Sequence, residues 1–165
     1  MNTIKVLSLL FISYTLIGCT KDNSGNIADI RPAVPVTVQN AMDYRPEPTV
    51  STSQAAGGSI QIILTIPAGL GRSIKEITKV AANTTYTQIQ GTGTTGFYNT
   101  APIVGSGTSA TFSTSLTEYF IKKPVSSSNP AAAPNVELGN RFYFLVTLDD
   151  GSVIVTEPVR VLVLN

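Results

Sequence analysis

The 165-residue sequence contains no histidine and no tryptophan, and its single cysteine is Cys19. Without histidine, Ser-His-Asp and Cys-His catalytic groups and histidine-ligated metal sites are excluded. Without a second cysteine, no internal disulfide can form, so the folded part must be stable through its core alone. The lack of tryptophan weakens the aromatic platform that many sugar-binding sites use. The sequence therefore predicts a protein that is not an enzyme and that uses no metal and no cofactor.

Charged residues are scarce too, at 13% of the chain. Removal of the first eighteen residues takes Lys5 with them and leaves ten basic and ten acidic side chains. A net charge of zero argues against nucleic acid or anionic lipid as a partner. Threonine, serine, glycine and asparagine are abundant, as is common in extracellular β proteins. A carboxylate-based hydrolase is the remote catalytic alternative, since it needs neither histidine nor cysteine.

The chain opens with Lys5 and an apolar run from Val6 to Ile17. A helix that spans a bilayer needs about 20 apolar residues, so this shorter run predicts the hydrophobic region of a secretion signal. A transmembrane anchor and a conventional secretion signal that contains a buried cysteine are the alternatives.

The run ends in a short motif, LIGC, made of Leu16, Ile17, Gly18 and Cys19. This motif resembles the lipobox of bacterial lipoprotein precursors. The resemblance implies that residues 1–18 are a removed signal peptide and that Cys19 is acylated. Two or three acyl chains hold a protein stably on a membrane. The expected partner is therefore a membrane, reached through acylated Cys19.

Residues 19–31 comprise the lipidated cysteine and a polar segment that we expect to act as a flexible tether. Thr20 follows the cysteine where inner-membrane lipoproteins of enterobacteria carry aspartate. The segment TKDNSG, with Lys21 and Asp22, resembles the export signals of surface lipoproteins in Bacteroidota-type bacteria. We therefore expect a lipid-anchored outer-membrane protein, with the cell surface favoured over the periplasmic face.

Residues 32–165 predict one domain rich in β-strands. The segment SIQIILTIP places Ile60, Ile62, Leu64 and Ile66 on one face, which is the alternation of a half-buried strand. Alternating apolar residues predict further strands over residues 34–38, 109–116, 141–148, 153–156 and 159–164. The prolines of the first of these strands confine it to a sheet edge. Asp150 and Gly151 are expected to supply the positive φ values of a tight hairpin, and Pro158 to mark a change of partner or a bulge.

Two segments allow a helix. In 74–82, Ile74, Ile77 and Val80 are spaced as on a helix, but the β-branched residues favour a strand. The neighbouring segment TTYTQIQ, residues 84–90, is strand-like. Ser115 and Glu118 form a capping box before YFIKK and Pro124, which predicts one or two helical turns. The low-complexity stretch 124–135 predicts an exposed connection.

The segment LGNRFYFLVTLDDGSVIVTEPVRVLV resembles the last two strands of fibronectin type III and related immunoglobulin-like domains. Phe142 stands where that family carries a corner tyrosine, and Tyr143 is adjacent to it. The resemblance implies an all-β fold, a single immunoglobulin- or fibronectin III-like β-sandwich of about seven strands with one short helical turn. As a whole the chain resembles the small single-domain lipoproteins of Bacteroidota-type bacteria.

Four aromatic residues lie in or beside predicted loops: Tyr86, Phe97, Tyr98 and Tyr119. Clustered at one end of the domain, they would form a glycan- or peptide-binding surface, because tyrosine combines an apolar ring with a polar tip. The alternative is that these rings cover the ends of the core. Asp149 and Asp150 suit a turn better than a calcium site, since two adjacent carboxylates rarely converge on one ion.

These features predict a lipid-anchored binding module outside the cytoplasm, whose partner is a glycan or an outer-membrane protein. The alternative is a structural or assembly subunit of an outer-membrane complex, in which an edge strand pairs with another subunit.

Overall fold

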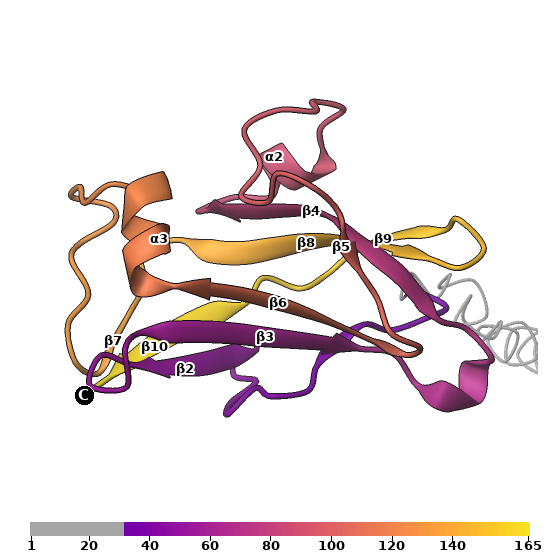
Figure 1. Cartoon of the computed structure of the whole chain (residues 1–165), viewed down its shortest axis with the longest axis horizontal. Helices are drawn as coiled ribbons and strands as arrows, with labels where there is room; N and C mark the ends of the chain where they lie inside the picture. Colours follow the sequence, from indigo (N-terminus) through magenta and orange to yellow (C-terminus); the bar gives the residue numbers. More distant parts are fainter. Residues whose placement is uncertain (1–31) are drawn as a thin grey trace, which may run out of the picture. The chain divides into compact units, whose positions relative to one another are not determined.

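The computed structural model describes residues 32–165, so the predicted signal peptide, the lipobox, Cys19 and the tether lie outside the described residues. Its elements are β1 (Thr37–Val38), β2 (Thr49–Ser53), β3 (Ser59–Thr65), the 3-10 turn η1 (Ala68–Leu70), β4 (Ile74–Asn83), α2 (Thr87–Gln90), β5 (Ile103–Val104), β6 (Ser109–Ser115), α3 (Leu116–Lys122), β7 (Val136–Glu137), β8 (Arg141–Leu148), β9 (Val153–Val155) and β10 (Arg160–Leu164) (Figure 1). The described part is all-β in class, as predicted. It has more strands than expected, because the strands β2, β5 and β7 were not predicted.

The first sheet has the order β1-β3-β6 and is antiparallel throughout. β3 confirms the predicted alternation, since Ile60, Ile62 and Leu64 are fully buried. β1 pairs with β3 alone and so forms an edge of the sheet, where the preceding Pro35 costs no ladder hydrogen bond.

The second sheet has the order β5-β4-β8-β9. β4 confirms the predicted strand over 74–82 and shows why its sequence imitates a helix. Its pairing with β8 shifts register between Ile74 and Glu76 and again between Ile77 and Lys79. Each bulge adds one residue, so side chains three apart return to the same face. Ile74, Ile77 and Val80 consequently all point into the core.

The third sheet has the order β2-β10-β7, in which β10 runs parallel to β2 and antiparallel to β7. Pro158 separates β9 from β10. Val159 still pairs with Phe142 of β8, and the strand pairs with β2 from Arg160 onward, so the predicted change of partner lies just after the proline. Val159, Val161 and Val163 are fully buried, so the alternation of the last strand is also confirmed.

One hydrophobic core joins side chains of all three sheets. Its centre is aromatic: the ring of Phe112 lies 5.3 Å from that of Phe142 and 5.5 Å from that of Phe144. Fully burying one large apolar side chain contributes about 1.5–3 kcal/mol. A core of this kind explains how a domain without disulfides holds its strands together.

Helix α3 confirms the predicted helical turns and the Ser115 half of the capping box, whereas the Glu118 carboxylate accepts from the Thr114 hydroxyl at 2.9 Å. The Ser115 hydroxyl accepts the backbone N–H of Glu118 at 3.1 Å, and Pro124 follows the helix end. Glu118 lies in the first turn and Lys122 in the last, where each charge complements the helix dipole.

The prediction of a strand over residues 84–90 is wrong, because residues Thr87–Gln90 form the short helix α2. The segment from residue 84 to residue 97 protrudes from the sheet beside β4 (Figure 1). Ile89 is its one fully buried side chain. One helical turn is enough to bury the single apolar side chain of this segment. The apparent alternation of its residues therefore did not indicate a strand that pairs in a sheet.

The β8–β9 hairpin turns at Gly151, whose φ is 83°. Asp150 does not share this positive φ, which corrects the expected turn geometry. Instead, the Asp150 carboxylate accepts the backbone N–H of Ser152 at 2.8 Å, and the Gly151 N–H donates to Leu148 O.

Candidate functional site

The four aromatic residues predicted to form a binding surface separate into two pairs. Tyr98 and Tyr119 are 4% and 0% exposed, so their rings belong to the core. Tyr86 is 39% exposed and Phe97 is half-buried, so only these two can contact a ligand. The surface prediction was therefore wrong for Tyr98 and Tyr119, whose rings instead fill the core.

Tyr98 packs edge-on against Phe112 and Phe142, with ring centroids 5.6 and 5.3 Å away. Its hydroxyl forms a 2.8 Å hydrogen bond with that of Thr114. Burial raises the pKa of Tyr98 to about 12. The ring thus seals the core beside β4 and carries no free polar group.

Tyr119 is the centre of a buried polar network. Its hydroxyl donates to Oδ1 of Asn129 at 2.6 Å and accepts from the backbone N and from Nδ2 of Asn140, at 3.2 and 3.0 Å. A phenol offers one donor and two acceptor sites, so the hydroxyl is fully used. Asn129 is 3% exposed, so the stretch 124–135, predicted to be an exposed connection, is anchored in the core at this residue.

The two surface aromatics flank a second, smaller hydrophobic cluster made of Ala81, Ile89 and Tyr143. Ala81 and Tyr143 alternate with core residues along β4 and β8, so this cluster lies on the outer face of the four-stranded sheet. Phe97 packs against it, and the Tyr86 ring meets that of Tyr143 edge-on at 4.8 Å. The α2 segment is thus fixed to this face by a few apolar contacts.

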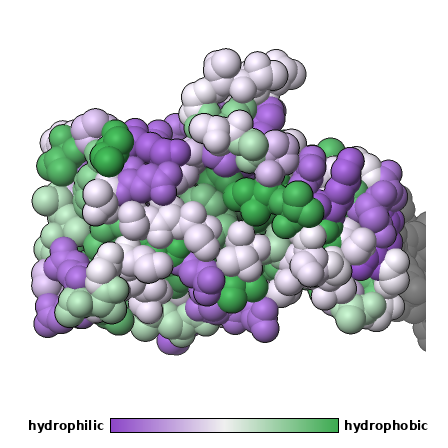
Figure 2. All heavy atoms as spheres, in the orientation of Figure 1, coloured by the Kyte–Doolittle hydropathy of each residue, from purple (hydrophilic) through white to green (hydrophobic). Residues whose placement is uncertain are grey.

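Burial, followed by the carboxylates of Glu47 and Glu157, raises the pKa of Tyr86. Its hydroxyl is therefore neutral at neutral pH, and the ring offers an apolar face with a polar tip. Figure 2 shows that the tip of the protruding segment is pale, and that an apolar area lies close to β5. Val104 of β5 is 79% exposed.

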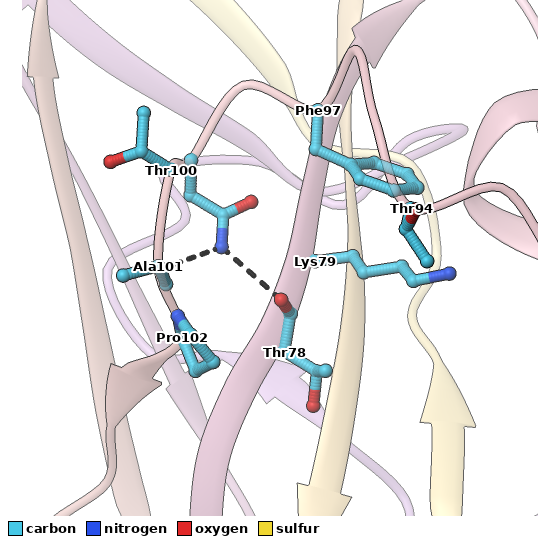
Figure 3. A pocket seen from close by; sticks show the side chains of 8 residues that line it. Thr78, Lys79, Thr94, Phe97, Thr100, Ala101 and Pro102 are labelled. Carbon is cyan, nitrogen blue, oxygen red and sulfur yellow. Dashed lines mark hydrogen bonds between the residues drawn. The ribbon is translucent and has the colours of Figure 1, made fainter.

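A shallow pocket of about 190 Å³ lies between β4 and the loop that leads to β5. Its lining comprises Thr78, Lys79, Thr94, Phe97, Asn99, Thr100, Ala101 and Pro102. Figure 3 shows the aliphatic stem of Lys79 beneath the Phe97 ring, with Ala101 and Pro102 on the opposite side. Ligand pockets for drug-sized molecules measure roughly 300–1,000 Å³, so this one suits a single ring or side chain of a larger ligand.

Asn99 builds the wall of this pocket. Its Nδ2 donates to Thr78 O at 3.2 Å and to Ala101 O at 2.9 Å, and its Oδ1 accepts the backbone N–H of Val80 at 2.7 Å (Figure 3). The amide therefore has both donors engaged, and its role is to hold the loop against β4. The hydroxyl of Thr78 is bonded to Thr147, away from the cavity.

Lys79 is the one charged side chain among the lining residues. Its Nζ donates to Gly91 O at 3.3 Å and to Gly93 O at 3.0 Å, and lies 4.7 Å from the centroid of the Phe97 ring. A cation over an aromatic face contributes about 0.5–1 kcal/mol at an exposed site. The strand pattern places Lys79 on the outer face, but its meeting with Phe97 depends on the loop fold and was not predictable.

Carboxylates of the described part are mostly held by arginines. Asp149 and Asp150 both contact Arg72, which lowers the pKa of each carboxyl group. These three residues form a clamp, in which Arg72 holds the turn of the β8–β9 hairpin. Glu47 binds Nε of Arg141 at 2.6 Å. Within residues 32–165, no group of three or more acidic, cysteine or histidine side chains is placed to hold a metal ion.

The sequence and the structure were compared with known proteins, and no protein family, curated protein or solved structure matches. Among the described residues, no helix has both the length and the apolar character needed to cross a bilayer.

Proposed function

We propose that this chain is a lipid-anchored binding module outside the cytoplasm, which binds a glycan through the Lys79–Phe97 pocket and catalyses no reaction. The pocket is the observation that carries the proposal. It combines the half-buried ring of Phe97 with Thr94 and Thr100, two exposed threonines whose hydroxyls make no hydrogen bond within residues 32–165. An aromatic ring beside free hydroxyls matches a sugar ring, which has apolar C–H faces and polar edges.

We propose further that the domain is an immunoglobulin- or fibronectin III-like sandwich. The strand orders β1-β3-β6 and β4-β8-β9 correspond to the A-B-E and C-F-G neighbours of that fold, and one core is shared between them. Phe142 lacks the hydroxyl of the family's corner tyrosine. Tyr119 provides a comparable hydroxyl-to-backbone bond at this corner, to the N–H of Asn140.

The proposed location is the outer membrane, with the domain on the cell surface. It rests on the lipobox residues Leu16, Ile17 and Gly18 and on Cys19, and on the sequence that follows them. The variant Cys19→Ala removes the acylated thiol and should release the protein from membranes, as measured by fractionation of expressing cells. Retention equal to that of the unaltered protein would refute the anchor.

Protease added to whole cells should digest the domain, whereas protection until the outer membrane is broken would place it on the periplasmic face.

An assembly subunit is the second candidate, and the edge of β6 favours it. Within residues 32–165, this seven-residue strand pairs with β3 along one side and with no strand along the other, and it is longer than the other edge strands, β1, β2, β5, β7 and β9. An unpaired strand edge accepts a strand from another chain. A carboxylate-based hydrolase stays the remote alternative.

A glycan array probed with the full chain in detergent tests the binding proposal. We expect a defined set of glycans to be retained and Phe97→Ala to lose them. Tyr44→Ala is the matched control, because Tyr44 is 51% exposed but lies outside the pocket. Retention that Phe97→Ala leaves unchanged would refute binding at this pocket. A complete lack of retained glycans, together with a protein partner lost on altering β6, would favour the assembly role.

A further inference from the structure

The ammonium group of Lys79 is only partly satisfied by the fold. An ammonium has three N–H donors, and two of them are given to Gly91 O and Gly93 O. No ion pair among residues 32–165 includes Lys79, whereas Arg72, Arg141 and Arg160 each contact a carboxylate there. The Lys79 side chain is half-buried along its length, while the hydrogen bonds of its ammonium group lie at an exposed position.

The position of this charge is fixed rather than mobile. The two carbonyl groups and the Phe97 ring, 4.7 Å from Nζ, hold the ammonium at one end of the pocket. Figure 3 shows this end of Lys79 beside Thr94, while Ala101 and Pro102 lie on the other side of the pocket. One end of the pocket is thus cationic and the other end is apolar.

A ligand group that fits both ends carries an anionic oxygen on one side of a small ring. We propose that the pocket binds a carboxylate-bearing sugar residue, a uronic acid, at the end of a glycan. The inference rests on the proposed function and narrows its ligand class. The carboxylate accepts the third N–H of Lys79 and the hydroxyl of Thr94, and the apolar face of the sugar ring packs on Phe97. The volume of about 190 Å³ admits one such ring and leaves the rest of the glycan in solvent.

The ammonium of Lys79 attracts a carboxylate through its third N–H. Charge-assisted hydrogen bonds are roughly twice as strong as neutral ones. A bond to a charged group contributes about 1.5–3 kcal/mol, which corresponds to a preference of roughly tenfold or more over a neutral sugar.

The test compares methyl glucuronide with methyl glucoside, which differ only in the carboxylate, by NMR titration of the full chain in detergent micelles. We expect the glucuronide to bind about tenfold more tightly, and the preference to weaken as salt is raised. Thr94→Asp places a carboxylate beside Lys79, which pairs with the ammonium and repels the carboxylate of the ligand, and should abolish the preference. Thr85→Asp adds the same charge at an exposed threonine outside the pocket, so it is the matched control and should keep the preference.

Lys79→Met removes the charge itself, and the amide signals of Gly91 and Gly93 report whether the loop keeps its place. Equal affinity for both glycosides would overturn the acidic-sugar assignment while leaving the glycan-binding function intact. Binding of neither glycoside would overturn the assignment, and the glycan array then decides the function. Tighter binding of an acidic peptide than of the glucuronide would also overturn it, in favour of a protein ligand.

Discussion

The side chain of Asn99 accepts the backbone N–H of Val80 at 2.7 Å, in the middle of strand β4. The backbone N–H of the preceding residue, Tyr98, donates to Val80 O. The loop therefore pairs with β4 much as another strand would, with the asparagine amide in place of a peptide group. This relationship fixes the wall of the pocket before any ligand binds, so the pocket does not depend on ligand binding to form.

We expect Asn99→Ala to cost about 1–3 kcal/mol of stability and to abolish glycan binding, because the Val80 N–H loses its acceptor. Denaturant unfolding and the glycan array measure the two effects. Asn40→Ala is the matched control, since Asn40 bonds to the backbone of Gln61 and Ile63 in the same manner but far from the pocket. The control should lose stability and retain binding. Full binding by Asn99→Ala would show that the wall is not needed.

Tyr119→Phe should destabilise the domain by about 1–3 kcal/mol without altering ligand binding. The change removes the hydroxyl that bonds Asn129 and Asn140 inside the core, and buried polar groups left without partners are costly. Tyr44→Phe removes a hydroxyl bonded to Val38 O at an exposed residue and should cost only about 0.5 kcal/mol. If urea unfolding gave the same loss of unfolding free energy for both variants, the Tyr119 hydroxyl would not be the centre of a stabilising buried network.

Ile89→Ala should loosen the α2 segment and leave the main core intact, because Ile89 belongs to the separate outer cluster. We expect faster amide hydrogen exchange over residues 84–97, with little change in β3. Ile62→Ala deletes the same atoms from the main core and should cost about 2–5 kcal/mol overall. A comparable global loss for Ile89→Ala would mean that the two clusters unfold as one.

The clamp between Arg72 and the β8–β9 hairpin predicts a pH effect. Arg72 lowers the folded-state pKa of Asp149 and Asp150 below the unfolded value of about 3.9. Their stabilising contribution is therefore complete above about pH 5 and is lost as the pH falls through the lowered values. Thermal unfolding of Arg72→Met between pH 5 and pH 2 should show a smaller loss of stability than the unaltered protein.

Arg45→Met is the control for this pH series, because Arg45 pairs with Asp43 at a highly exposed position. It should change the acid profile less than Arg72→Met does, since one carboxylate is affected instead of two. Identical profiles for Arg72→Met and the unaltered protein would show that the clamp adds no stability.

The sequence predicted the strands correctly where one face of the strand is buried and the other is not, because their side chains alternate between apolar and polar. The alternation of Ile60, Ile62 and Leu64 and that of Val159, Val161 and Val163 both identified core faces correctly. At residues 84–90, the apparent alternation of side chains led to a wrong strand prediction. A four-residue helix with one buried side chain is too short to produce a helical periodicity in the sequence. It was ambiguous in β4, where bulges convert a strand period into an apparent helical one.

The candidate site was less predictable than the strands. Phe97 was identified as a surface aromatic, but nothing local separates it from Tyr98, which turns into the core one residue later. Lys79 and Asn99 are twenty residues apart in sequence, and only the loop's hydrogen bonds to β4 bring them to one pocket. Asn129 was hidden in a low-complexity stretch, because a buried polar residue has no sequence pattern of its own.

The central claim is that the Lys79–Phe97 pocket binds the ligand of this module. The most direct measurement is photo-cross-linking of a glycan retained on the array to the full chain, followed by mass spectrometry of the labelled peptides. We predict labels within residues 94–102 and their loss when the unlabelled glycan competes. Labels confined to the β6 edge, or spread evenly over the domain, would contradict the claim.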